Sequence, residues 1–292
     1  MIEFKYKEPM IFISGEGRSG TTLMRAILGS HPNVTMAGND YDIVKLYNDM
    51  KTKNYPLSDK NSLKHRMMTY GDLKLWNLDW NKFWDIFFYY CKTPEDVIYT
   101  IFNNLYDKGN RSRLGMKRPS FIRYIPELEK LFPNSKYIFM IRDPRSVIAS
   151  KKFLYGEKQF NDLRKIDQLA IRWKKHLIKY RNYYGRYPGQ IKKIKYEELI
   201  TNPSEVIKEI CEFVEIDYNP RMLNYDKYWG KDGYIVEAPK SSFPKEINKK
   251  VDIYKSVLEK WREKLTDREI KIIERITSPY IKEEGYIAEQ IK

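Results

Sequence analysis

Short apolar runs alternate with amphipathic segments along most of this chain. Strand-like runs occupy residues 10–14, 114–116, 136–142 and 190–195, and the segments between them carry apolar residues at helical spacing. This alternation is typical of proteins in which a parallel sheet is covered by helices on both faces. The pattern therefore predicts an α/β fold with a central parallel sheet.

Helix-start signals support this interpretation. Thr93 precedes a proline, Asn202 precedes a second one, and a T-x-x-E capping box begins at Thr266. Each of these three positions is expected to begin a helix.

The aromatic-rich region 41–110 shows no clear strand and is predicted to be a helical insertion on the acceptor side. Trp76, Trp80 and Trp84 recur every four residues, which would place them on one helical face, either as a core stripe or as an acceptor-binding wall. Because the chain has no internal repeat, linker or composition break, residues 1–292 are expected to form a single domain.

Composition fits a globular protein: 42% of the 292 residues are hydrophobic and 15% are aromatic, which excludes collagen-like and wholly disordered chains. The formal net charge is +15. Residues 111–200 hold 23 Lys/Arg against 8 Asp/Glu, and this difference accounts for the whole net charge of the chain. Such a basic segment is either a solvated face or the mark of an anionic partner. That partner could be a nucleic acid or a small phosphorylated or sulfated ligand.

The sequence carries no clear signal for export or membrane insertion. The first residues alternate in charge where a signal peptide needs an apolar core. The aromatic-apolar run 83–91 is far shorter than the ~20 residues that cross a bilayer. Cys91 and Cys211 suit neither a metal knuckle nor a disulfide framework. We therefore expect a cytoplasmic protein without a membrane span.

A glycine-rich loop follows the first predicted strand and opens a helix at 21–29. Residues 15–22 read G-E-G-R-S-G-T-T, and the free amides at such a helix start attract an anion. A dinucleotide site would explain G-x-G-x-x-G and Asp40 about twenty residues on, but not the arginine and threonines of the loop. A Mg-NTP loop would need lysine where Thr21 stands. The loop is therefore expected to bind an anion, but not a Mg-NTP.

A third ligand class accounts for the whole loop. The run R-S-G-T-T-L after a strand resembles the 5′-phosphosulfate loop of sulfotransferases that use 3′-phosphoadenosine 5′-phosphosulfate (PAPS). The family's second motif, a strand ending in arginine and a helix bearing a serine, holds the 3′-phosphate and is matched by Arg142 and Ser150. Ligands of parallel sheets bind at the carboxyl ends of strands, so both motifs can face one nucleotide.

This resemblance extends from about Ile11 to Trp261 and is closest to the tyrosylprotein sulfotransferase branch. It implies a P-loop-like three-layer α/β fold and a metal-free, in-line displacement with PAPS as donor and PAP as product. Positioning and electrostatic stabilisation should supply most of the catalysis in such a transfer.

The resemblance also assigns roles to single residues. Lys117, at the end of a predicted strand, corresponds to the lysine that neutralises or protonates the leaving group. An aromatic ring of the pocket would face adenine, and Ser256 is a weaker candidate for a phosphate contact. The predicted nucleotide-binding residues are Arg18, which also counts as catalytic, Ser19, Gly20, Thr21, Thr22, Arg142, Ser150, Tyr196, Lys260 and Trp261.

The general base is predicted from its place after the first helix. Asp40, in the sequence G-N-D, corresponds to the branch's glutamate, with Asp42 and His31 as its rivals. His65 and His176 have no motif context and are expected at the surface.

Together these features predict a sulfotransferase that moves a sulfuryl group from PAPS to a hydroxyl or amine of a saccharide, glycolipid or small-molecule natural product. The alternative acceptor is peptidyl tyrosine. The preference rests on the missing secretory signal and on Arg118, which stands where the branch usually carries an acidic residue.

Two alternatives belong to other classes, a P-loop-type nucleotide kinase and a basic nucleic-acid-binding protein. The first would bind ATP with magnesium more tightly than PAP, and the second would bind nucleic acid with steep salt dependence. No metal site and no nucleic-acid partner are expected. The surplus positive charge leaves open whether the acceptor is itself anionic.

Overall fold

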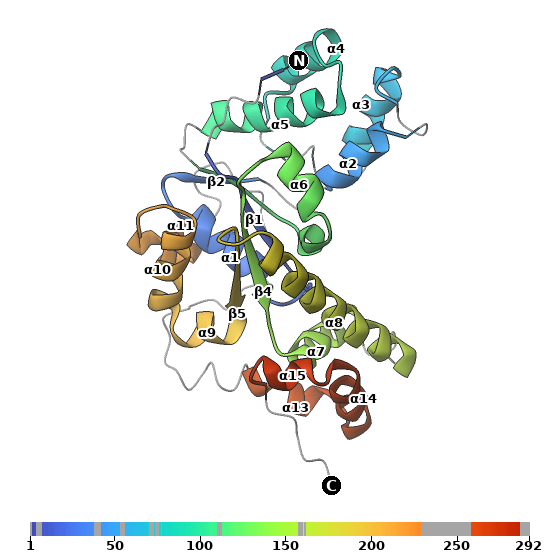
Figure 1. Cartoon of the computed structure of the whole chain (residues 1–292), viewed down its shortest axis with the longest axis vertical. Helices are drawn as coiled ribbons and strands as arrows, with labels where there is room; N and C mark the ends of the chain where they lie inside the picture. The colour runs from blue at the N-terminus through green and yellow to red at the C-terminus, as the bar shows by residue number, and fades with distance from the viewer. Residues whose placement is uncertain are drawn as a thin grey trace.

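A five-stranded parallel sheet lies at the centre of the computed structural model (Figure 1). The structure describes residues 2–3, 8–37, 42–52, 56–69, 73, 76, 78–109, 113–156, 160, 162–228 and 258–286. Its strand order is β2-β3-β1-β4-β5. The strands are β1 (Ile11–Gly15), β2 (Val34–Met36), β3 (Arg113–Lys117), β4 (Lys136–Ile141) and β5 (Ile191–Lys195).

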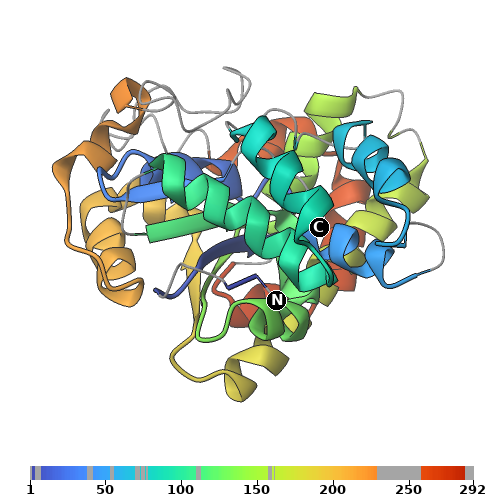
Figure 2. The ribbon, with the colours of Figure 1, turned by 90° about the horizontal axis from the view of Figure 1, so that it is seen from above.

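Helices cover both sides of this sheet (Figure 2). The α-helices are α1 (Thr21–Gly29), α2 (Ile43–Met50), α3 (Lys60–Thr69), α4 (Trp80–Tyr89), α5 (Pro94–Gly109), α6 (Ile125–Leu131), α7 (Pro144–Tyr155), α8 (Leu163–Arg186), α9 (Tyr196–Thr201), α10 (Pro203–Phe213), α11 (Tyr225–Tyr228), α13 (Trp261–Lys264), α14 (Asp267–Thr277) and α15 (Tyr280–Glu283). Two short 3₁₀ helices are η2 (Pro119–Arg123) and η4 (Pro220–Asn224). The layered α/β fold that the sequence predicts is confirmed.

Alternate residues of the central strands enter two separate hydrophobic cores. Ile11 and Ile13 of β1 pack in one cluster with residues of α1, α9 and α10. Phe12 points the other way, into a larger cluster with residues of α2–α6 and α8. A strand buried on both faces carries an unbroken apolar run, which is why β1 and β4 could be located from sequence.

Most of the predicted elements have their expected places. Helix α1 has the predicted bounds, Thr93 Oγ1 accepts a hydrogen bond from Asp96 N at 3.2 Å, and the capping box at Thr266 is complete. Asn202 precedes α10 without a side-chain capping bond. The sequence analysis missed β2, because three residues beside a proline turn give no periodic signal.

The described part of the aromatic region contains four α-helices, α2 to α5, and shows no strand. Trp80 and Trp84 lie on α4 with ring centroids 5.5 Å apart. Trp76 precedes that helix and is buried, 6.1 Å from the ring of Phe102. The prediction of one helical stripe of three tryptophans is therefore wrong for Trp76, which is a core residue.

Two further expectations concern membranes and thiols. None of the described helices combines the length and apolar character that a bilayer span requires. Cys91 and Cys211 are free thiols, and both are buried.

The strand order also fixes where a ligand can bind. Strand β1 lies between β3 and β4. The chain leaves β1 toward β2 on one side, whereas it leaves β4 toward β5 on the other. In open parallel sheets such a reversal marks the usual ligand site, which here would be at the carboxyl ends of β1 and β4.

Candidate functional site

Three neighbouring strands end at this edge of the sheet. In the sheet register, Ile13 of β1 pairs with Lys117, the last residue of β3, and Gly15 pairs with Met140 near the end of β4. Arg142 follows β4 directly. The sheet therefore brings Lys117, the loop 15–20 and Arg142 to one edge, as the two sequence motifs predict.

The loop 15–20 folds tightly over the end of β1. Gly20 has φ of 88° and Arg18 has φ of 78°, both in the left-handed region, and Ser19 N donates to Glu16 O at 3.0 Å. Gly20 is the N-cap of α1, so no side chain caps this helix, and its first turn contains no acidic residue. The positive end of α1 is thus left to an external anion.

Gly20 has no room for a side chain, because a Cβ there would lie 2.5 Å from Cδ2 of Tyr196. Gly20→Ala must displace the ring and adopt a left-handed conformation that costs about 1–2 kcal/mol. We expect PAP affinity to fall about tenfold or more, measured by calorimetry. Gly17→Ala is the matched control, since its Cβ would lie 3.9 Å from Lys151 Cε. Equal affinities of the two variants would contradict the expectation.

Two guanidinium groups and a hydroxyl converge beside the loop. Arg18 Nε donates to Ser150 Oγ at 3.0 Å, and Arg142 NH1 donates to Arg18 O at 3.3 Å. Burial and the neighbouring Arg142 charge lower the pKa of Arg18. Among the described residues no carboxylate forms an ion pair with either arginine. Juxtaposed, partly buried cations that form no ion pair are unfavourable unless an anion binds them.

Aromatic side chains hold Arg142 in place. Its guanidinium carbon lies 4.3 Å from the ring centre of Tyr196, and its carbonyl oxygen accepts a hydrogen bond from Trp173 Nε1 at 2.9 Å. Arg142 Nε is buried and has no hydrogen-bond partner among the described residues. This unsatisfied donor fits a phosphate oxygen.

The structure groups the loop residues differently from the sequence analysis. The side chain of Arg18 lies with Arg142 and Ser150, the predicted 3′-phosphate residues, rather than apart from them. Ser19 is fully buried, and its hydroxyl has no hydrogen-bond partner among the described residues. Thr21 is buried and Thr22 is half-buried in the first turn of α1.

Lys117 is 5% exposed at the end of β3. The next residue, Arg118, forms an ion pair with Asp42 through NH2 and Oδ2 at 3.0 Å. Asp42 Oδ1 also accepts a hydrogen bond from Lys45 N at the start of α2. Both oxygens of Asp42 are therefore engaged, which argues against it as the general base. Asp40, the preferred base, lies outside the described residues.

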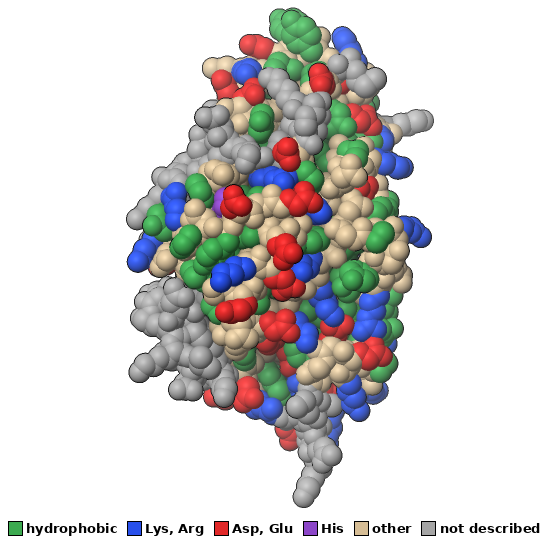
Figure 3. All heavy atoms as spheres, turned by 60° about the vertical axis from the view of Figure 1, so that its left-hand side comes forward, with side chains coloured by type: hydrophobic (Ala, Val, Ile, Leu, Met, Phe, Trp, Pro, Cys, Tyr) green, Lys and Arg blue, Asp and Glu red, His purple; other side chains and the backbone are tan. Residues whose placement is uncertain are grey.

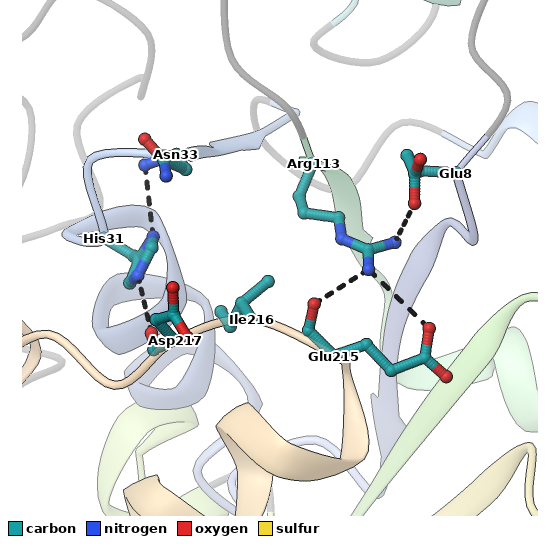
Figure 4. Close-up of a pocket in the computed structure, with 7 residues that line it drawn as sticks. All are labelled: Glu8, His31, Asn33, Arg113, Glu215, Ile216 and Asp217. Carbon is teal, nitrogen blue, oxygen red and sulfur yellow. Dashed lines mark hydrogen bonds and ion pairs between the residues drawn. The ribbon is translucent and has the colours of Figure 1, made fainter.

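His31 lies at the amino ends of the strands, at the opposite edge of the sheet. It lines a pocket of about 450 Å³ (Figure 4), where its Nδ1 accepts from Asn33 N at 3.1 Å and Nε2 lies 2.9 Å from Asp217 O. Arg113, the first residue of β3, forms an ion pair there with Glu8 at 3.1 Å. His31 as a rival base is therefore wrong, since it is placed away from the loop.

Two of the predicted nucleotide contacts, Lys260 and Trp261, lie in the C-terminal region. Trp261 is buried, and the guanidinium carbons of Arg145 and Arg262 lie 4.1 Å and 4.5 Å from its ring centre. Two guanidinium groups therefore contact this ring, and its place in the nucleotide pocket stays a prediction. Lys260 is exposed at the start of α13, and Ser256 lies outside the described residues.

A buried ionic cluster beneath the loop escaped sequence analysis. Glu16 forms ion pairs with Lys151 and Arg172, and its Oε2 lies 3.0 Å from His176 Nδ1. His176 is thus buried rather than at the surface, whereas His65 is exposed as expected. An acidic residue inside an anion-binding loop was an available signal, because a buried carboxylate requires a cationic partner.

The fold is that of a layered α/β protein, and the arginines beside its first β–α loop suit an anionic ligand. Residues 9–220 match the model of the sulfotransferase family. The chain therefore belongs to the sulfotransferase family and is an enzyme of that kind.

Several curated relatives are named more specifically, as protein-tyrosine sulfotransferases. Protein-tyrosine sulfotransferase A of Caenorhabditis elegans is 28% identical over 239 residues, which cover 80% of this chain and 57% of that protein. The matched part spans 72% of the putative protein-tyrosine sulfotransferase of Caenorhabditis briggsae, 57% of the Caenorhabditis elegans protein and 47% of that of Drosophila melanogaster. This chain thus corresponds to part of each relative.

Solved structures share the fold. The sulfotransferase domain from the curacin biosynthetic pathway is 20% identical, with a TM-score of 0.66 over 98% of this chain and 100% of that one. Mouse sulfotransferase SULT7A1, complexed with PAP, is 12% identical, with a TM-score of 0.54 over 97% and 87% of the two chains.

Proposed function

We propose that this enzyme transfers the sulfuryl group of PAPS to a phenolic hydroxyl of a tyrosyl residue. The donor half of the proposal is carried by the paired Arg18 and Arg142 beside Ser150, two cations that lack a carboxylate partner among the described residues. The acceptor half is supported by relatives named protein-tyrosine sulfotransferase. Those names favour the peptidyl-tyrosine alternative over the saccharide or small alcohol preferred from sequence.

The residues of the site suit the two ends of PAPS. The uncapped start of α1, with the amides of Thr21 and Thr22, would bind the 5′-phosphosulfate. Arg18, Arg142 and Ser150 would hold the 3′-phosphate through charge-assisted hydrogen bonds. When bound, PAPS supplies an activated sulfuryl group whose departure leaves negative charge on a bridging oxygen.

Protein groups then have to stabilise that charge and accept a proton. Lys117, on the strand next to the loop, would neutralise or protonate the leaving oxygen. Asp40 stays the predicted base for the acceptor hydroxyl. No group of three or more potential ligands for a metal ion occurs in the described part of the chain, and we expect EDTA to leave the rate unchanged.

The charge on the surface agrees with a small anionic donor. On the face shown in Figure 3, Lys/Arg and Asp/Glu side chains are intermingled instead of forming a basic stripe. A nucleic-acid-binding protein would concentrate cations along one surface. On this face the pattern favours the sulfotransferase proposal over that alternative.

Labelled sulfate transfer from PAPS tests the proposal across a panel of tyrosyl peptides, saccharides and small alcohols. We expect label on the peptide. Transfer only to a saccharide or an alcohol would overturn the acceptor. Tighter binding of ATP with magnesium than of PAP, measured by calorimetry, would overturn the donor.

A further inference from the structure

A buried ionic cluster joins the underside of the loop to two helices. The Glu16 carboxylate pairs with Lys151 of α7, and Arg172 of α8 contacts Oε1 through Nε at 2.9 Å and NH2 at 2.8 Å. Glu16 and Lys151 are each 3% exposed. Such a cluster is costly to bury unless its charges are paired, and here two cations face the one carboxylate.

His176 completes the cluster from the other side of Glu16. Its Nδ1 lies 3.0 Å from Glu16 Oε2, and its Nε2 lies 3.2 Å and 3.1 Å from Arg123 Nε and NH2. Because a guanidinium can only donate, Nε2 must accept, and the proton of a neutral ring lies on Nδ1, the ring nitrogen that is 3.0 Å from Glu16 Oε2. Burial opposes ionisation of Glu16, but His176, Lys151 and Arg172 outweigh it and lower the pKa of its carboxyl to about 2.

The loop is held at two points by consecutive residues of α7. Lys151 pairs with Glu16 of the loop. The preceding residue, Ser150, accepts a hydrogen bond from Arg18 of the same loop. Ser150 also belongs to the predicted 3′-phosphate subsite. The separation between the loop and that subsite therefore depends on the Glu16–Lys151 contact.

We propose that Glu16 is a positioning residue that fixes the loop against α7, so that one nucleotide can engage the start of α1 and the Arg18–Arg142–Ser150 subsite together. This inference rests on the proposed function. The Glu16 carboxylate contacts Lys151, Arg172 and His176 and acts through them.

The direction in which PAP affinity changes when the charge of Glu16 is removed separates a positioning role from a purely electrostatic one. Glu16→Gln removes a negative charge near an anion site, so a purely electrostatic role predicts tighter binding of PAP. A positioning role predicts weaker binding, because the two phosphate subsites lose their fixed spacing.

Calorimetry of PAP and 5′-AMP with wild type and Glu16→Gln tests the inference. We expect PAP affinity to fall about tenfold and 5′-AMP affinity to change less than threefold, since 5′-AMP lacks the 3′-phosphate and does not span both subsites. We also expect KM for PAPS to rise more than kcat falls. Equal losses for both nucleotides, or tighter PAP binding, would overturn the inference.

Two further variants complete the design. Glu198→Gln is the matched control, because Glu198 is 57% exposed and 3.6 Å from Lys195, and its affinities should equal those of wild type. If Glu16→Gln fails to fold, Arg172→Gln can replace it, because the Arg172 side chain is 45% exposed. Its PAP affinity should again fall more than its 5′-AMP affinity, by a smaller factor. Failure of wild type to bind PAP would instead refute the proposed function.

Discussion

Arg142→Ala is expected to lower the affinity for PAP at least a hundredfold. Arg142 lies at the carboxyl end of β4, 4.3 Å from the ring centre of Tyr196, with a buried Nε that has no hydrogen-bond partner among the described residues. Two charge-assisted hydrogen bonds to a phosphate contribute about 3 kcal/mol even at the low end of their range, which is more than a hundredfold in Kd. Calorimetric titration with PAP measures the loss.

The folded state should tolerate this substitution. The alanine variant loses the stack on Tyr196, but it also removes a like charge beside Arg18, whose pKa is lowered by burial and by Arg142. These effects oppose each other, so the melting temperature of the ligand-free protein should stay close to that of wild type.

Arg164→Ala controls for a general loss of positive charge. The Arg164 side chain is 85% exposed and pairs with Asp162, and exposed pairs contribute little. We expect its PAP affinity to match that of wild type. An Arg142→Ala variant that binds PAP within threefold of wild type would show that the anion binds elsewhere.

The parts of the site that follow from local sequence were predictable. Buried parallel strands give continuous apolar runs, and glycines mark the turn before α1, so the loop and Arg142 could be assigned to one edge of the sheet. The resemblance then added Ser150 and Lys117. Lys117 and Arg142 lie at the carboxyl ends of strands, where chain direction determines position, whereas Ser150 lies within α7.

Contacts between distant segments were not predictable. Glu16 and His176 are separated by 160 positions in the sequence, and only the packing of α8 on the sheet brings them together. The side-chain position of Arg18 was not predictable for the same reason, because it depends on a left-handed backbone and on a hydrogen bond to Ser150. His31 was misplaced for a related reason: it follows α1, which returns to the opposite edge of the sheet.

Lys117→Met is expected to lower kcat about a hundredfold to a thousandfold, with PAP affinity within threefold of wild type. Lys117 is 5% exposed at the end of β3, beside Ile13 of β1. Negative charge on the bridging oxygen develops only as the sulfuryl group departs, so a cation there stabilises the transition state more than bound PAPS. Methionine keeps the unbranched apolar stem and should preserve packing.

Steady-state kinetics with PAPS separates this role from ground-state binding. Lys117→Arg keeps the charge in a different geometry, so its kcat should lie between those of wild type and Lys117→Met. Because Arg142 and Lys117 are expected to affect different parameters, the two variants also control for each other. A Lys117→Met enzyme with normal kcat and a raised KM for PAPS would reassign Lys117 to nucleotide binding, since uniform binding affects KM alone.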